Sequence, residues 1–276
     1  MSTKIRMIAI DLDHTTLTDD HRLLPEVVEA VRSARRSGIH VVPATARSPQ
    51  GLHVISDLGI TGPVVCFNGA WTGTLTSSIA TGEALSHPLE SEDVVNVVAA
   101  AEKLGLNPCW YTSECMYTLH HGALVDRETR STGVTAEVVG LNEIIGHEVL
   151  KVLLLESSGC SADSLVDQFK SLSFVYSGKA LVEVISKGVS KKMALARVAE
   201  KFGLDFSEVA MVGDSENDIE AIQWAGLGIA MGNAVPSVMA VADMTVGTNE
   251  DAGLAQAFSH IALYNETAIT RIRSKR

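Results

Sequence analysis

The sequence lacks features that several protein classes require. Its four cysteines form no Cys-x-x-Cys pair and have no histidine partner at zinc-finger spacing, which argues against a disulfide framework and a zinc site. No apolar run approaches the ~18 to 20 residues of a membrane span, and the run before Asp11 is too short for a secretory signal. We therefore expect a cytoplasmic protein with no membrane partner.

Positive charge is also scarce. The chain has 22 Lys and Arg against 33 Asp and Glu, a net charge of -11. Proteins bind nucleic acid mainly through basic faces that contact phosphates, so we expect no nucleic-acid partner. An anionic substrate would need locally concentrated positive charge. Nothing in the sequence indicates an oligomeric state.

Both ends of the chain alternate between short apolar runs and helical segments. The 276 residues suffice for one large or two modest domains. The expected strands are 5–10, 39–43, 63–67, 209–212, 227–231 and 244–246, and the expected helices are 25–37, 48–58, 191–202, 216–225, 235–241 and 252–261. This alternation predicts an α/β fold with a Rossmann-like parallel sheet covered on both faces.

The pattern changes between residues 82 and 186. Expected there are helices at 92–104 and 162–172, a hairpin of 109–112 with 116–120, and strands at 149–155, 174–176 and 181–185. We interpret 82–186 as an inserted α+β cap domain on a catalytic core made of 1–81 and 187–276. A mobile cap would exclude water during chemistry. Its aromatic residues are expected to pack inside the cap, so we assign none of them to the substrate.

Two acidic clusters each follow an expected strand. Asp11 and Asp13 come after the first strand, and Asp214 and Asp218 come after 209–212. Because all strands of a parallel sheet end at one edge, these carboxylates can converge in one crevice. Clustered carboxylates repel one another unless a cation intervenes, and Mg²⁺ prefers oxygen ligands. The sequence therefore predicts a magnesium site.

Three further features carry chemistry only in combination. The Asp11 and Asp13 pair can divide nucleophilic attack and proton transfer, although such a pair alone more often caps a turn. Thr45 follows the second strand, where its hydroxyl and the turn amides can hold phosphate oxygens. Lys191 begins a helix, where the macrodipole disfavours a cation, which indicates a nearby anion. The neighbouring lysines, Lys187 and Lys192, make a solvated basic patch the alternative.

In order along the chain, four motifs resemble those of the haloacid dehalogenase-like phosphatases, specifically the Cof-type members with a large cap. Residues 11–15 resemble DxDGT, 45–47 resemble TGR, 187–191 resemble KGVSK and 213–218 resemble GDxxND. The segments Phe-Asn-Gly-Ala at 67–70 and Ala-Met-Gly-Asn-Ala at 230–234 strengthen the resemblance, which covers nearly the whole chain.

The resemblance implies a magnesium-dependent phosphatase that hydrolyses a small phosphorylated metabolite, such as a sugar phosphate, through an aspartyl-phosphate. Asp11 would be the nucleophile, and Asp13 would serve as acid and then as base. Mg²⁺ would be held by the Asp11 carboxylate, the Asp13 backbone carbonyl and Asp214, and Asp218 would support its water shell. The phosphoryl oxygens would be bound by Thr45, Lys191, Asn217 and the backbone amides of Leu12 and Ala46.

Alternatives and departures accompany this interpretation. A phosphomutase shares the aspartyl-phosphate, and a phosphate-ligand sensor could keep the fold without turnover. His14 and Ala46 stand where the family motifs have glycine, so both turns lose conformational freedom. We expect His14 to be tolerated in its loop and to have no catalytic role.

Overall fold

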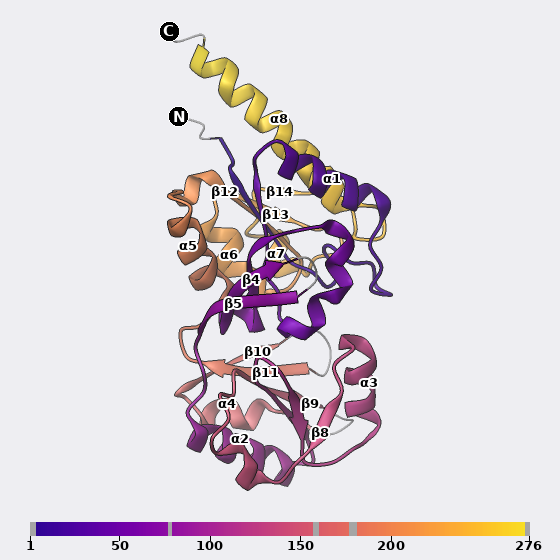
Figure 1. The fold of residues 1–276 in the computed structure, drawn as a ribbon, viewed down its shortest axis with the longest axis vertical. Helices are drawn as coiled ribbons and strands as arrows, with labels where there is room; N and C mark the ends of the chain where they lie inside the picture. Colours follow the sequence, from indigo (N-terminus) through magenta and orange to yellow (C-terminus); the bar gives the residue numbers. More distant parts are fainter. Residues whose placement is uncertain (1–3, 77–78, 157–159, 177–180, 274–276) are drawn as a thin grey trace.

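The computed structural model describes residues 4–76, 79–156, 160–176 and 181–273 (Figure 1). Five parallel strands form the central sheet in the order β14-β13-β12-β1-β2. Their bounds are β1 Met7–Ile10, β2 His40–Pro43, β12 Val209–Gly213, β13 Leu227–Ala230 and β14 Met244–Thr245. The predicted Rossmann-like α/β core is confirmed.

The central strands are buried on both faces. Every residue of β1 and β12 is buried, as expected of parallel strands covered by helices on both sides. The covering helices are α1 Pro25–Arg36, α5 Lys191–Lys201, α6 Ile219–Trp224, α7 Pro236–Met239 and α8 Gly253–Arg273. α5 begins where predicted because the Ser190 hydroxyl accepts a hydrogen bond from the Met193 amide.

The expected third strand does not continue the parallel sheet. β3 Gly62–Cys66 pairs antiparallel with β4 Trp71–Thr76, and β5 Ile79–Ser86 completes a separate three-stranded sheet. β3 meets the end of β2 only at the bridge between Ala44 and Val65. The chain reverses through the 3₁₀ turn η2 Phe67–Gly69, whose residues all have positive φ. This short turn can join only antiparallel strands, because a parallel pair needs a long crossover connection.

Several expected elements have different limits. The segment after Ser48 is a 3₁₀ helix, η1 Pro49–Leu58, and not an α-helix. The helix expected near 162–172 is only α4 Asp163–Gln168, because the chain turns extended into β10 Leu172–Tyr176. The last helix continues twelve residues past the expected end at 261 to Arg273.

The insert has its own sheet, and its buried side chains divide between two clusters. Trp110 and Val152 belong to a cluster within the insert, whereas Tyr111 and Leu153 join the cluster of the central sheet. The order of its six strands is β10-β11-β9-β6-β7-β8, and the other bounds are β6 Asn107–Tyr111, β7 Met116–Thr118, β8 Ala136–Val138, β9 Lys151–Leu155 and β11 Leu181–Ser186. Helix α2 Ser91–Lys103 packs on it, while α3 Ala123–Thr132 and β8 were not predicted. Figure 1 shows this part at the end opposite both termini.

The predicted hairpin is present as β6 and β7, and its aromatic residues pack as expected. Trp110 and Tyr111 are buried, and Tyr117 stacks on Trp110 with ring centroids 6.1 Å apart. The domain limits stay a prediction. Residue 82, the predicted start of the insert, lies within strand β5. Within the described residues, no helix combines the length and apolar character needed to cross a membrane.

Candidate active site

The carboxylates that follow β1 and β12 meet because these strands are neighbours. Ile10 is in register with Val212, and the Asp11 amide donates to the Val212 carbonyl at 3.0 Å. The chain leaves β1 toward β2 on one side, whereas β12 to β14 lie on the other. The carboxyl ends at such a change of strand order form the usual ligand crevice of an open α/β sheet. Asp11 and Asp214 therefore lie at this crevice.

Lys191 is the cation that faces these carboxylates. Its Nζ lies 2.5 Å from Asp11 Oδ1 and 2.7 Å from Asp218 Oδ1, and the side chain is fully buried. The carboxylates hold the pKa of Lys191 above its usual value despite its burial, so the ammonium stays charged. Lys187 and Lys192 are exposed, and Lys187 donates to the Lys170 carbonyl. The solvated-patch alternative therefore does not describe Lys191.

The residues present fit a divalent cation. Carboxylate oxygens of Asp11, Asp214 and Asp218 lie within 4.8 Å of one another, and all three residues are buried. Burial raises the pKa of Asp11 well above its ordinary value. Burial and the nearby Asp218 carboxylate raise the pKa of Asp214 to about 6. One ammonium does not neutralise three buried carboxylates, and an all-oxygen donor set suits Mg²⁺.

The Asp218 carboxylate accepts hydrogen bonds from two backbone amides and from Lys191. Its Oδ2 accepts from the backbone amides of Asp214 and Ser215 at 3.0 and 3.1 Å, and its Oδ1 accepts from Lys191. The two oxygens of Asp214 accept from the Thr15 and Ser215 hydroxyls at 2.7 and 2.8 Å. These contacts hold the carboxylates of Asp214 and Asp218 in fixed orientations.

The Asp13 carboxylate lies apart from this cluster, on Arg47. Arg47 Nε donates to Oδ2 at 2.8 Å and NH2 donates to Oδ1 at 2.6 Å, and His21 Nδ1 lies 3.3 Å from Oδ1. Burial alone would raise the pKa of Asp13, but the hydrogen bonds from His21 and Arg47 hold it well below its usual range. Arg47 NH1 is buried and has no hydrogen-bond partner among the described residues.

No role of Arg47 or His21 was predicted from the sequence. Arg47 belongs to the second motif, and its spacing from Thr45 was the available signal. His21 has positive φ in the turn after Thr18, and its Nε2 lies 3.3 Å from Ser131 Oγ in the insert. Because the two residues are 110 positions apart, the local sequence around either one does not predict this contact.

The Thr45 loop is held from three sides. The Thr45 amide donates to Val65, its hydroxyl accepts from the Arg47 amide, and its carbonyl accepts from the Asn68 amide. Lys151 of the insert donates to the Ala46 carbonyl at 2.9 Å. Ala46 does not have positive φ, so the motif position does not demand glycine here.

Four of the predicted residues, Asp11, Asp13, Ala46 and Asn217, line one cavity of about 190 Å³ together with residues of the insert. From the core it is lined by Asp11, Asp13, His14, His21, Ala46, Arg47, Ser215 and Asn217, and from the insert by Glu128, Ser131, Thr132, Lys151, Leu181 and Glu183. Leu12 is buried below it, where its carbonyl accepts from the Thr16 amide. Thr45, Lys191, Asp214 and Asp218 are not among the lining residues. An insert over this edge of the sheet was expected, but the insert residues that form the wall were not predicted.

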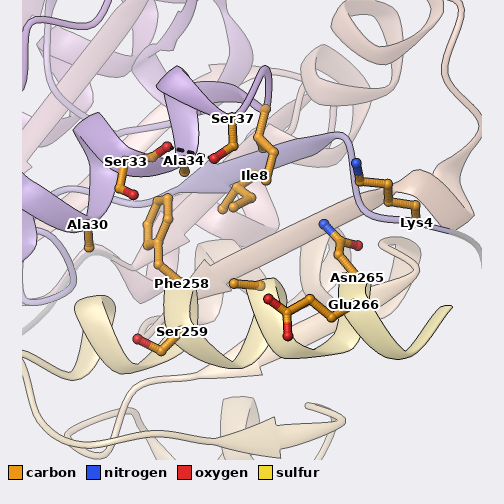
Figure 2. A pocket seen from close by; sticks show the side chains of 12 residues that line it. Lys4, Ile8, Ala30, Ser33, Ala34, Ser37, Phe258, Ser259, Asn265 and Glu266 are labelled. Carbon is orange, nitrogen blue, oxygen red and sulfur yellow. Dashed lines mark hydrogen bonds between the residues drawn. The ribbon is translucent and has the colours of Figure 1, made fainter. Parts of the chain in front are cut away.

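A second cavity of about 340 Å³ lies between α1 and α8, away from these residues (Figure 2). Serine hydroxyls and apolar side chains such as Ile8 and Phe258 line it, and Lys4 and Glu266 lie at one end. Among the residues that the structure describes, no cluster of carboxylates lines it. The candidate chemistry therefore belongs to the cavity between core and insert.

Known proteins resemble the chain over nearly its full length. A pyridoxal phosphate phosphatase of Escherichia coli, YbhA, is 28% identical over 93% of this chain and 98% of its own. The phosphatase YitU of Bacillus subtilis, named for 5-amino-6-(5-phospho-D-ribitylamino)uracil, is 27% identical over 93% and 97%. A haloacid dehalogenase-like hydrolase structure from Bacteroides thetaiotaomicron superposes with a TM-score of 0.83 at 24% identity, over 94% of this chain and all of its own.

The family assignment rests on a match that spans the core and the insert together. The sequence profile of the haloacid dehalogenase-like hydrolases matches residues 8–258, a range that contains both acidic clusters, the Thr45 loop and Lys191. The resemblance seen in the motifs is confirmed, and the chain belongs to the haloacid dehalogenase-like hydrolase family.

Proposed function

We propose that this protein is a magnesium-dependent phosphatase that hydrolyses a small phosphomonoester through an aspartyl-phosphate. It is a hydrolase by family, and the relatives named above are phosphatases. The single observation that carries the proposal is the convergence of Asp11, Asp214, Asp218 and Lys191 at one crevice. An anionic carboxylate can approach an anionic phosphate only where positive charge is concentrated.

The proposed reaction has two steps at phosphorus. The Asp11 carboxylate attacks phosphorus, the bond to the ester oxygen breaks, and that oxygen takes the Asp13 proton. A water then attacks the aspartyl-phosphate, Asp13 accepts its proton, and inorganic phosphate leaves with Asp11 restored. Mg²⁺, held by the Asp11 and Asp214 carboxylates and the Asp13 backbone carbonyl, with Asp218 in support, would neutralise the phosphoryl charge.

Other groups bind and orient the phosphate. Lys191 and the Thr45 hydroxyl, together with Asn217 and the amides of Leu12 and Ala46, bind its oxygens in this proposal. The unpartnered NH1 of Arg47 donates to the bound phosphate. A phosphate at this position competes with Asp13 for the guanidinium, so the pKa of Asp13 rises toward the range of a proton donor.

The test is phosphate release from a panel of sugar phosphates, pyridoxal phosphate, nucleotides and flavin precursors, with and without Mg²⁺. We expect release that depends on Mg²⁺ and is abolished in Asp11→Asn, which keeps the shape of the side chain but not the nucleophile. Equal release by Asp11→Asn would contradict the nucleophile assignment. Isomerised sugar phosphate without free phosphate would favour a phosphomutase, and binding without turnover would favour a sensor.

A further inference from the structure

Asn68 connects the insert to the proposed phosphate-binding groups. Its side chain is 2% exposed and makes two hydrogen bonds. Nδ2 donates to Glu183 Oε2 on β11 at 2.8 Å, and Oδ1 accepts from Asn217 Nδ2 at 3.0 Å. Its backbone amide donates to the Thr45 carbonyl. Asn68 therefore contacts two loops of the site and one strand of the insert.

The backbone of Asn68 is held in an unusual conformation. Asn68 has φ 53° and ψ 26°, in the left-handed region that asparagine tolerates better than most residues. The next residue, Gly69, has φ 104°, and a Cβ there would come within 2.4 Å of the Ser190 carbonyl. The turn is thus packed directly against the start of α5, next to Lys191. The backbone of Asn68 therefore has a fixed position relative to Lys191.

The hydrogen bonds of Asn68 have a fixed direction. The Glu183 carboxylate can only accept, so Asn68 must present its NH₂ group to Glu183 and its carbonyl oxygen to Asn217. Asn217 must then donate one of its two N–H groups to Asn68. The second N–H group of Asn217 stays available for a phosphoryl oxygen.

Packing alone does not determine the orientation of the Asn217 amide. Asn217 lines the site cavity and also a third cavity, of about 330 Å³ beside β10, so space borders it on two sides. Its Oδ1 has no hydrogen-bond partner within the part of the chain that the structure describes. The bond to Asn68 is therefore the contact that selects which end of the amide faces the site.

Glu183 is itself held by Lys151, which lies on β9 of the insert and also contacts the core. Lys151 Nζ lies 3.4 Å from Glu183 Oε1 and donates to the Ala46 carbonyl at 2.9 Å. The same ammonium lies over the rings of Phe67 and Tyr111, 5.3 and 4.8 Å from their centroids. The insert thereby contacts both the Ala46 loop and the Asn68 turn through one buried ion pair.

We propose that Asn68 is a positioning residue that orients the Asn217 amide toward phosphate, and that Glu183 of the insert sets this orientation. The inference rests on the proposed phosphate-binding role of Asn217. Under this proposal the phosphate site is complete only when the insert is in contact with the core, because Glu183, which accepts the hydrogen bond from Asn68, belongs to the insert.

The experiment compares Asn68→Asp, Glu183→Gln and the double variant. Asn68→Asp still accepts from Asn217 but places a second carboxylate against Glu183, and we expect the affinity for inorganic phosphate, measured by calorimetry with Mg²⁺, to fall about 10-fold or more. In the double variant, the amide that Glu183→Gln introduces donates to the new carboxylate, and the net charge of the cluster is restored. We expect its affinity to return to within about 3-fold of wild type.

Asn68→Gly is the matched control for the rescue. Glycine accepts the left-handed backbone and removes both side-chain hydrogen bonds without adding charge, so phosphate affinity should fall and Glu183→Gln should not restore it. The proposal is overturned if folded Asn68→Asp and Asn68→Gly bind phosphate like wild type, or if the double variant binds no better than Asn68→Asp. If Asn68→Asp does not fold, a folded Asn68→Gly that binds phosphate like wild type still overturns the proposal.

Phosphate affinity also separates this inference from the proposed function. A wild-type protein that binds phosphate without hydrolysing esters would contradict the phosphatase but leave the comparison of variants decisive. A wild-type protein that binds no phosphate at all would overturn both. With an active enzyme, kcat/KM for p-nitrophenyl phosphate should follow the phosphate affinities of the variants.

Discussion

Lys191 Nζ lies 2.5 Å from Asp11 Oδ1, although the two residues are 180 positions apart in the sequence. Both side chains are buried, and the same ammonium contacts Asp218 at 2.7 Å. A buried ammonium between two carboxylates is stable only while all partners are present, because each unpaired charge would carry its full desolvation cost. The site is therefore sensitive to the loss of this one cation.

Lys191→Met should destabilise the protein by about 3–5 kcal/mol, because it leaves buried carboxylates without their cation. Urea unfolding measures the free energy directly. Lys192→Met is the control, since that side chain is exposed and adjacent on the same helix, and we expect a change within about 0.5 kcal/mol. Equal effects of the two substitutions would show that Lys191 does not stabilise these carboxylates.

If Mg²⁺ binds the buried carboxylates of the folded state as proposed, it should raise the thermal unfolding midpoint of the wild-type protein. At about 100 times its Kd the stabilisation is about 2.7 kcal/mol. Asp214→Asn should lose most of this shift, as followed by differential scanning calorimetry with Mg²⁺ or EDTA. The exposed Asp57→Asn should keep it. A shift that survives in Asp214→Asn would place the metal elsewhere.

His14→Gly should keep the activity of the wild-type enzyme. His14 has φ 58°, the left-handed region that glycine enters without cost, and its imidazole contacts the exposed Asp19 at 2.9 Å. Steady-state phosphate release checks the expectation. A loss of turnover greater than about 10-fold would show that the imidazole contributes to the reaction.

The cysteines should differ in reactivity toward iodoacetamide. Burial raises the pKa of the Cys66 thiol far above its ordinary value and that of Cys109 to about 12, whereas Cys115 and Cys160 are partly exposed. Because the thiolate is the reactive form, native protein at a pH of about 8 should be alkylated at Cys115 and Cys160 only. Mass spectrometry of digested samples reads the result, and unfolding in urea should make all four sites reactive. Rapid native labelling of Cys66 would contradict its burial.

The sequence by itself determined the core and the groups at its edge. Short buried runs bounded by proline, serine and glycine predict β1, β2, β12, α1 and α5 closely, because local propensity and burial agree there. The rule that parallel strands end at one edge then brings Asp11 and Asp214 together. The family resemblance distinguished Lys191 from its neighbours, and the structure shows it buried between the carboxylates.

The reversal after β3 was partly visible in the sequence. Asn68 and Gly69 form the dipeptide that most strongly favours a tight hairpin, and apolar runs flank it. The alternation of strands and helices nearby favoured a parallel third strand instead. The hairpin became evident only from the pairing of β3 with β4.

Only the tertiary structure decided what faces the crevice from the insert. Lys151 and Glu183 occupy strands whose local pattern is typical of cap core, yet they contact the Ala46 loop and Asn68. Arg47 pairs with Asp13 across 34 positions, and His21 reaches Ser131 across 110. Local sequence encodes which segments are buried, but the partner of a buried polar side chain depends on how distant segments pack, so such partners cannot be inferred from periodicity.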